Sequence, residues 1–149
     1  KNSREMNKYD FNTTDFKHKE HIQMRFSDLD AMNHVNNGYQ MHYYDVGRIN
    51  YCETVLGRRM DWTKDFMVIV HLELDFIASI EMGMDVVVET KTVGFGSKSM
   101  KMFQRIIDNN TGDVKSTCFT ILSGIDRVNH CSQAFPEEFK QTFLDFEAR

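Results

Sequence analysis

The chain has 149 residues, of which 41% are hydrophobic and 27% are charged, and its formal net charge at pH 7 is −4. This size and composition fit one globular domain. The acidic balance argues against nucleic acid as the main partner, because phosphate binding requires concentrated Lys and Arg. No apolar run approaches the roughly 20 residues of a membrane span, and residues 1–19 lack the apolar centre of a signal peptide. We therefore expect a cytoplasmic protein in which residues 1–19 form a flexible lead-in.

Two elements are predicted in the first part of the chain, a strand over about residues 20–27 and a long helix over residues 37–56. The strand is predicted because apolar and polar side chains alternate. The helix is predicted because the stretch lacks proline and its apolar side chains recur at helical spacing, with Tyr39, Tyr43 and Val46 as one stripe. Few charges interrupt the helix, so we expect protein to surround most of it.

After a helix stop at Gly57, the hydrophobic pattern changes to the period of two that is typical of strands. Long strands are predicted over about residues 66–80, 84–93, 98–108 and 114–125. The last two are separated by Asn109-Asn110-Thr111-Gly112, a strong signal for a hairpin turn. Consecutive strands joined by short turns predict an antiparallel meander. The last predicted element is a short helix that begins at Pro136 and carries a stripe of three phenylalanines.

Together these elements predict one α+β domain over residues 1–149, with an antiparallel sheet of about five strands wrapped around the long helix. One face of such a sheet must be covered, and the long, largely apolar helix is the natural cover. A single sheet with one helix leaves a sheet edge exposed, so we expect pairing with a second copy of the chain. The sequence has no repeat, low-complexity tract or linker that would divide it.

Polar side chains concentrate where the first strand leads into the long helix. They are Asp28, Asp30, His34, Asn36 and Asn37. Asn at a helix start is a good cap, because its side chain accepts a hydrogen bond from an otherwise unpaired backbone N–H. The remaining N–H groups and the helix dipole favour negative charge at this end. A carboxylate beside an anion-stabilising helix end indicates a hydrolytic site.

Residues 25–48 resemble the beginning of the hot-dog fold acyl thioesterases, the group that includes 4-hydroxybenzoyl-CoA thioesterase and the plant acyl-ACP thioesterases. The resemblance is carried by Phe26-Ser27-Asp28-Leu29-Asp30, His34-Val35-Asn36-Asn37, Tyr39, Tyr43, Tyr44, Asp45 and Arg48. It extends over about residues 18–140, and the Gly94-Phe95-Gly96-Ser97 break falls where such proteins turn between two strands. The resemblance implies the hot-dog fold.

In this family the second Asp of the Asp-x-Asp motif is the catalytic carboxylate, so the resemblance implies a catalytic role for Asp30. It also implies that the backbone N–H of Asn37 polarises the thioester carbonyl, with Asn36 and Gly38 beside it as substrate-binding residues. A carboxylate can act as a general base on water or as a direct nucleophile, and both alternatives stay open. His34 is a catalytic candidate that can orient Asp30, donate to the substrate or satisfy the loop backbone.

The acidic residues of this segment also have structural interpretations. Asp30 is a candidate turn cap, because Asp commonly bonds to its own backbone in turns. Asp28 is expected to bond to backbone groups or to pair with Arg25 or Arg48. Asp45 lies inside the helix and needs a partner, and Arg48 is within i,i+3 reach of it.

The motif departs from the family at one position. Plant acyl-ACP thioesterases have an Asn two residues after the catalytic Asp, where this chain has Met32. Asn33 is adjacent but one place out of register, so the role of that family Asn is not transferred to it.

The leading functional prediction is a thioesterase of fatty acid metabolism that hydrolyses an acyl-CoA or acyl-ACP thioester without a metal or cofactor. The cysteines have no CxxC spacing, and no metal-ligand spacing is visible. The resemblance implies a homodimer or a tetramer built as a dimer of dimers, with each active site at a subunit interface. A hot-dog hydratase or dehydratase is one alternative, although its typical Asp-x-Asn-Pro pattern is absent. A non-catalytic protein that binds acyl thioesters is the other.

Overall fold

The computed structural model describes residues 15–65 and 67–149. Its elements in chain order are β1 (His18–His21), the 3-10 turn η2 (Phe26–Asp28), α1 (Asn37–Leu56), β2 (Met67–Phe76), β3 (Val86–Phe95), β4 (Ser99–Asp108), β5 (Val114–Asp126), β6 (Cys131–Gln133) and α2 (Glu137–Glu147). Of the lead-in expected over residues 1–19, residues 1–14 lie outside the described residues, and Lys19 already belongs to β1.

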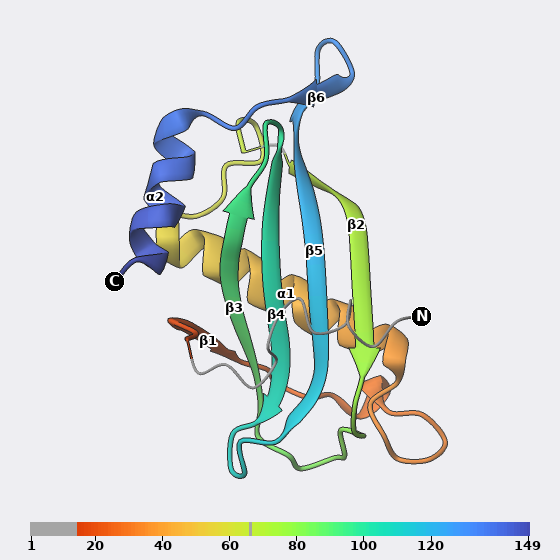
Figure 1. The fold of residues 1–149 in the computed structure, drawn as a ribbon. Coiled ribbons are helices and arrows are strands. Elements are labelled where there is room, and N and C mark those ends of the chain that lie inside the picture. The colour runs from red at the N-terminus through yellow and green to blue at the C-terminus, as the bar shows by residue number, and fades with distance from the viewer. Residues whose placement is uncertain (1–14, 66) are drawn as a thin grey trace, which may run out of the picture.

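The described strands form one antiparallel sheet in the order β1-β3-β4-β5-β2, with β6 paired to the end of β5. Helix α1 crosses one face of this sheet, and α2 lies beside β3 near the end of α1 (Figure 1). The predicted α+β architecture, a sheet around one long helix, is confirmed. The short strand β6 was not expected, because residues 131–133 are too few for an alternating pattern to stand out.

Strand β2 occupies a different place in the sheet from the one that a simple meander predicts. Strands β3, β4 and β5 form a meander, but β2 pairs with β5 and not with β3. The two edges of β3 are taken by β4 and by β1, whose residues His18–His21 pair with residues 87–90. The connection from β2 to β3 therefore crosses the end of the sheet, where the N–H groups of Ile77 and Ala78 donate to Lys115 O.

The first strand ends earlier than its alternating pattern predicts. Strand β1 stops at His21, and residues 26–28 form a 3-10 turn instead of continuing the sheet. The pattern misleads at Phe26, which is 82% exposed. The chain turns here because the carboxylate of Asp28 accepts the N–H of Arg25 and closes the turn.

Helix α1 has the bounds that the sequence predicts. The side chain of Asn36 accepts the N–H of Gly38 at 2.8 Å, so the predicted N-cap is confirmed. Gly57 ends the helix with a φ of 68°, a left-handed conformation that glycine adopts without a Cβ penalty.

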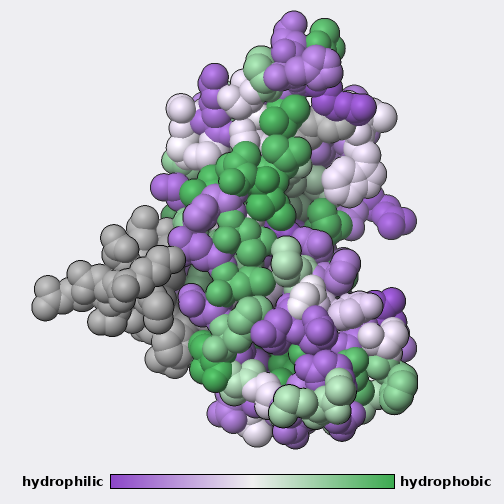
Figure 2. Space-filling view, turned by 90° about the vertical axis from the view of Figure 1, so that its right-hand side faces the viewer, coloured by the Kyte–Doolittle hydropathy of each residue, from purple (hydrophilic) through white to green (hydrophobic). Residues whose placement is uncertain are grey.

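The face of α1 that packs against the sheet is offset from the predicted stripe. Its buried residues are Gln40, Tyr43, Tyr44, Gly47, Arg48, Tyr51 and Cys52. Val46, expected in the stripe, is 45% exposed, and Met41 is also exposed. The expectation that protein surrounds the helix is therefore wrong for a single chain. An exposed apolar band runs along the side of the molecule that carries the β2 edge (Figure 2). In β2 itself, Val68, Ile69 and Val70 are exposed.

Apolar side chains fill the space between α1 and the sheet in two clusters. The cluster toward α2 includes Tyr51, Cys52, Met100, Met102, Leu122, Phe135, Phe143 and Phe146. The cluster toward the start of α1 includes Val35, Tyr43, Tyr44, Ile80, Val86, Val88, Ile106 and Cys118. Helix α2 begins after Pro136 as predicted, and its phenylalanine stripe faces the first of these clusters.

The predicted pair of Asp45 and Arg48 is confirmed, with Arg48 Nη1 donating to Asp45 Oδ1 at 2.7 Å. The buried member of the pair is Arg48, because the side chain of Asp45 is 58% exposed. Arg48 Nη2 also donates to Gln104 Oε1 at 3.2 Å and to Thr120 Oγ1 at 3.3 Å. A charge inside the helix–sheet interface is thus supplied with acceptors from both layers.

A close approach between α1 and β3 depends on Gly47. A Cβ atom at this position would lie 2.5 Å from Val88 Cγ1 and 2.9 Å from Val88 Cβ. The branched side chain of Val88 is stiff at χ1 and packed in the core, so it cannot swing away. Glycine therefore sets the distance between helix and sheet here.

We expect Gly47→Ala to lower the free energy of unfolding by about 1–3 kcal/mol, the usual cost of overpacking, even though Ala favours a helix by about 1 kcal/mol over Gly. Chemical denaturation measures this change. In a Val88→Ala background the same substitution is expected to cost less, because the clashing methyl group is gone. An equal cost in both backgrounds would contradict a steric origin.

Candidate active site

The chain between η2 and α1 folds back on itself in a closed loop. Leu29 and Val35 form an isolated antiparallel bridge, and the N–H of Asp30 donates to His34 O at 2.8 Å. Asn33 has a φ of 62°, a left-handed conformation that Asn tolerates better than most residues. These bonds place the polar residues of the motif next to the first turn of α1.

Asp28 fixes this loop to the helix. Its fully buried carboxylate accepts hydrogen bonds from the Arg25 N–H at 3.0 Å, Arg25 Nε at 3.2 Å and the Tyr43 hydroxyl at 2.6 Å. Its backbone C=O accepts the N–H of Asn36 at 2.9 Å. Burial opposes ionisation, but the bonds from Tyr43 and Arg25 outweigh it and hold the pKa of Asp28 below its ordinary value. The structural role predicted for Asp28 is confirmed, with Arg25 and not Arg48 as its partner.

Asp30 is oriented by its own loop. Its Oδ1 accepts the N–H of Met32 at 2.9 Å and the N–H of His34 at 3.2 Å. Its Oδ2 accepts no hydrogen bond from any residue in the described part of the chain. The turn-capping and catalytic interpretations of Asp30 are therefore compatible, because each one uses a different oxygen of the carboxylate. The loop uses Oδ1, and Oδ2 is available to water or a substrate.

The first turn of α1 has an N–H group that its cap does not use. Asn36 Oδ1 accepts the N–H of Gly38 at 2.8 Å, and Asn36 O accepts the N–H groups of Tyr39 at 2.9 Å and Gln40 at 3.3 Å. The N–H of Asn37 donates to no residue within the described ranges. Because the helix dipole is positive at this end, the Asn37 N–H is suited to an anionic oxygen.

Asp30 and Asn37 line the same groove, where the start of α1 meets the end of β2 at the lower right of Figure 1. The groove has a volume of about 360 Å³. Its lining residues are Asp30, His34, Val35, Asn37, Gln40, Phe76, Ile77, Ala78 and Ser79. The structure thus brings together the candidates Asp30, His34 and Asn37. Asn36 and Gly38 bond to each other as the helix cap and are not part of the lining.

His34 contacts Asp30 through its backbone and directs its side chain elsewhere. Its N–H donates to Asp30 Oδ1, as described above. Its imidazole Nε2 lies 3.9 Å from Glu81 Oε1, and the backbones of His34 and Glu81 form an isolated bridge. The side chain of His34 keeps 33% of its surface exposed, and His34 is one of the residues that line the groove.

Several groove residues were not singled out from the sequence. Gln40 is 2% exposed, on a helix face where a polar residue is unusual. A signal existed, because Gln40 lies three residues after Asn37 and so shares its face. Residues 76–79 were missed because the position of β2 in the sheet was wrong. Met32 and Asn33 do not line the groove, so the family Asn has no counterpart here.

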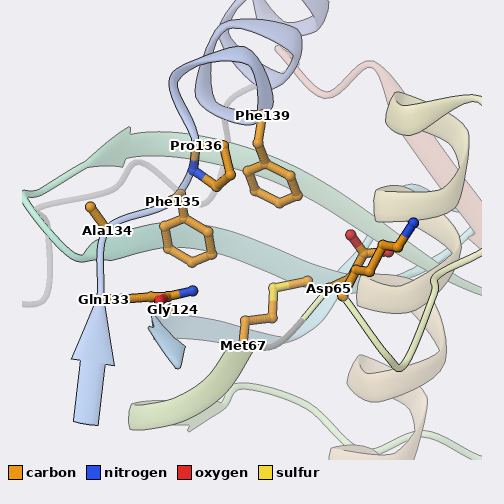
Figure 3. A pocket seen from close by; sticks show the side chains of 9 residues that line it. Asp65, Met67, Gly124, Gln133, Ala134, Phe135, Pro136 and Phe139 are labelled. Atoms are coloured by element: carbon orange, nitrogen blue, oxygen red, sulfur yellow. The ribbon is translucent and has the colours of Figure 1, made fainter. Parts of the chain in front are cut away.

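A smaller pocket of about 90 Å³ lies between the end of β5, β6 and the start of α2 (Figure 3). Its walls include Phe135 and Phe139, whose rings stack with centroids 5.2 Å apart. Its carboxylate, Asp65, is held by two nitrogens of Arg58 at 2.6 and 3.0 Å. The acid in this pocket is therefore engaged by a salt bridge, whereas Asp30 presents an unengaged oxygen to the groove.

Residues 15–65 and 67–149 contain no group of three or more His, Cys, Asp or Glu side chains arranged to hold a metal ion. Within the same ranges, no helix is both long enough and apolar enough to cross a bilayer. The cytoplasmic location stays a prediction from the sequence.

A sheet wrapped around one long central helix is the arrangement of the hot-dog fold. Residues 24–143 match the model of the family described as the Thioesterase-like superfamily. The chain belongs to this superfamily, which confirms the resemblance seen in residues 25–48. No curated protein matches the chain significantly.

Solved structures share this fold over most of their length. A thioesterase complexed with coenzyme A and Zn from Thermus thermophilus is 26% identical, with a TM-score of 0.81 over 92% of this chain and 98% of that one. A predicted thioesterase from Bacillus stearothermophilus is 20% identical, with a TM-score of 0.78 over 86% and 94%. A DHNA-CoA thioesterase from Staphylococcus aureus is 18% identical, with a TM-score of 0.76 over 87% and 90%. These similarities confirm the hot-dog fold.

We expect Asp28→Asn to lower the free energy of unfolding at pH 7 by roughly 1–3 kcal/mol, because a buried amide cannot satisfy the donors that the carboxylate accepts. The folded-state pKa of Asp28 lies below its ordinary value of 3.8. The ionised carboxylate therefore stabilises the fold above the unfolded-state pKa, and this contribution is lost as the pH falls through the folded-state pKa. Denaturation of both proteins between pH 7 and pH 2 is expected to show their difference shrinking with acid.

Asp145→Asn, on the exposed face of α2, is the matched control for this comparison. Its difference from wild type is expected to be small at every pH. An effect of Asp28→Asn that does not depend on pH would contradict a role for the ionised carboxylate.

Proposed function

We propose that this protein is a thioesterase that hydrolyses an acyl-CoA thioester in the groove between α1 and the end of β2. The observation that carries this function is the presence in one groove of an unengaged carboxylate oxygen, Asp30 Oδ2, and an unengaged helix-terminal donor, the Asn37 N–H. Thioester hydrolysis needs a base or nucleophile and a fixed donor for the developing oxyanion. The loop and the helix cap hold these two groups in place without substrate.

In the proposed reaction, the carbonyl oxygen of the substrate accepts a hydrogen bond from the Asn37 N–H. Asp30 Oδ2 removes a proton from water as the water oxygen attacks the carbonyl carbon. The negative charge that develops on the carbonyl oxygen is stabilised by the Asn37 N–H, and a donor of this kind is worth roughly 3–4 kcal/mol. The tetrahedral intermediate then expels the thiolate, which takes the proton from Asp30, and the carboxylic acid is released.

Direct attack by Asp30 Oδ2 is the alternative first step and uses the same groups. It would form an anhydride between the acyl group and Asp30 and expel the thiolate, after which water would hydrolyse the anhydride. In both routes the imidazole of His34 is proposed to contact the substrate from the side of the groove. The Asn36–Gly38 cap is proposed to act through Asn37, by holding the first helical turn in place.

Coenzyme A is the carrier that the comparisons favour, because the chain is similar to a thioesterase complexed with coenzyme A. The wall of the groove opposite the helix is largely apolar, with Phe76, Ile77 and Ala78 available to an acyl group. An acyl carrier protein is the alternative carrier and would present the same thioester to Asp30.

The first measurement is thiol release from a panel of short-chain, long-chain and aromatic acyl-CoAs. We expect wild type to cleave at least one of them and Asp30→Asn to lower kcat by roughly 100-fold to 10,000-fold, the usual contribution of a general base. Asn keeps the size of Asp and the acceptor at Oδ1 but cannot act as a base or nucleophile. Asp145→Asn, far from the groove, is expected to keep the wild-type kcat.

Other outcomes of the panel assign other functions. Turnover that survives in folded Asp30→Asn would refute the catalytic assignment. Hydration of crotonyl-CoA without thiol release would identify a hydratase. Tight binding without turnover, on acyl-CoA and acyl-ACP of every chain length, would identify a binding protein.

We also propose that the active assembly contains at least two copies of the chain. Among the described strands β2 pairs on one side only, with β5, and its apolar residues Val68, Ile69 and Val70 are exposed. Exposed sheet edges and apolar patches of this kind ordinarily mark an interface. The groove wall at residues 76–79 begins at the last residue of β2, so a second copy at this edge would also border the groove.

We expect light scattering to give at least twice the monomer mass of 17.5 kDa. Val70→Lys, which places a charge on the exposed apolar edge of β2, is expected to dissociate the assembly and lower the activity. Val128→Lys is the matched control, because Val128 is 85% exposed in the turn between β5 and β6. A fully active monomer would contradict the expected assembly.

A further inference from the structure

Gln40 is a buried amide in the groove whose hydrogen-bonding capacity is unused. The residue is 2% exposed and lines the groove together with Asp30 and Asn37. Its Oε1 is enclosed and accepts no hydrogen bond within the described ranges. Its Nε2 makes none there either, yet it is not among the enclosed unpaired atoms, so this end of the amide keeps some exposed surface. Because an unpaired buried polar group destabilises a fold, its presence in the groove indicates a use.

A second buried glutamine shows how a structural amide behaves in the same protein. Gln104, on β4, donates from Nε2 to Tyr44 O at 3.1 Å and to Thr90 Oγ1 at 3.0 Å. Its Oε1 accepts a hydrogen bond from Arg48 Nη2 at 3.2 Å. Both ends of Gln104 are therefore engaged between helix and sheet, while neither end of Gln40 is.

The helix geometry directs the Gln40 side chain toward the proposed oxyanion position. Gln40 follows Asn37 by three residues, so the two share a face of α1. Side chains on a helix lean toward its N-terminus, which brings the Gln40 carboxamide back toward the first turn. The unengaged Asn37 N–H lies in that turn, whereas the next N–H, that of Gly38, is bonded to Asn36.

We propose that Gln40 Nε2 donates a second hydrogen bond to the thioester oxygen, beside the Asn37 N–H, and acts as a catalytic residue. This assignment rests on the thioesterase function proposed above and adds a second oxyanion donor to it. A developing oxyanion is stabilised by preorganised donors, and a side-chain amide of Gln is one of the groups that supply them. A neutral amide also suits this groove, because a Lys or Arg would pair with the Asp30 carboxylate instead.

The test begins with Gln40→Met, which keeps the length of the side chain but removes the donor. We expect kcat to fall roughly 100-fold with little change in KM, because the lost bond is strongest in the transition state. The midpoint of thermal unfolding is expected to stay the same or rise, because the unpaired Oε1 disappears with the donor. A wild-type kcat in this variant would overturn the assignment.

Gln40→Glu tests whether the group that faces the substrate is a donor. An ionised Glu has the shape of Gln but only accepts hydrogen bonds, and its charge opposes an oxyanion. We therefore expect a larger fall in kcat than in Gln40→Met. A wild-type kcat in Gln40→Glu that persists above the pKa of the introduced Glu would show that an acceptor faces the groove and would overturn the donor role.

Gln104→Met is the matched control for a purely structural glutamine. It removes the partners of Arg48, Tyr44 and Thr90, so it is expected to lower the unfolding midpoint while folded protein keeps its kcat. If Gln40→Met lost activity only in proportion to the loss of folded protein, Gln40 would be a structural residue like Gln104. That result would overturn the catalytic assignment of Gln40.

A bound analogue separates this assignment from the thioesterase function itself. In a dethia acyl-CoA a CH₂ group replaces the sulfur, so the carbonyl group binds without being hydrolysed. Its infrared carbonyl stretch is expected to lie at lower frequency in wild type than in Gln40→Met, because each donor polarises the C=O bond. Equal frequencies would overturn the role of Gln40 even if wild type hydrolyses acyl-CoA. Failure of wild type to release any thiol would instead overturn the function proposed for the whole groove.

Discussion

The buried carboxylate of Asp28 is the interaction on which the geometry of the groove depends. It binds Arg25 on the strand side and the Tyr43 hydroxyl on the helix side, while its C=O takes the N–H of Asn36. Asp28 therefore anchors both ends of the loop that carries Asp30, by its bonds to Arg25 before the loop and to Asn36 after it. Productive sites require placement within about 0.5 Å, and a desolvated anion with several donors provides that restraint better than an exposed ion pair.

The distance between α1 and the sheet is set by a second contact. Gly47 has no Cβ, so the helix can approach Val88 of β3 closely. This matters for the groove, because one wall belongs to α1 and the other to the segment after β2, and only their relative position creates the space between them.

Three polar groups at the groove have no partner among the described residues: Asp30 Oδ2, the Asn37 N–H and the Gln40 amide. Asp30 and Asn37 are exposed, so water can satisfy their unpaired groups, whereas Gln40 is buried, where polar groups are nearly always paired. The bonds to Oδ1 orient Asp30, and the Asn36 cap orients the first turn that carries the Asn37 N–H. The donors and the carboxylate are oriented when the chain folds, so little reorganisation remains for the reaction, which is the physical content of electrostatic preorganisation.

The sequence by itself determined the bounds of α1 and the presence of the long strands and α2, because caps, glycine stops and hydrophobic periods are local signals. It also indicated that Asp30, His34 and Asn37 lie close together, since they belong to one short segment and cannot move far apart. Only the tertiary structure decided that β2 lies beside β5, that Asp28 binds Tyr43, and that Gln40 faces the groove. Strand neighbours depend on which sheet edges other segments have occupied, and the burial of a helical side chain depends on the surface against which the helix packs. Neither the neighbours of a strand nor the burial of a helical side chain can be predicted from the local pattern of residues.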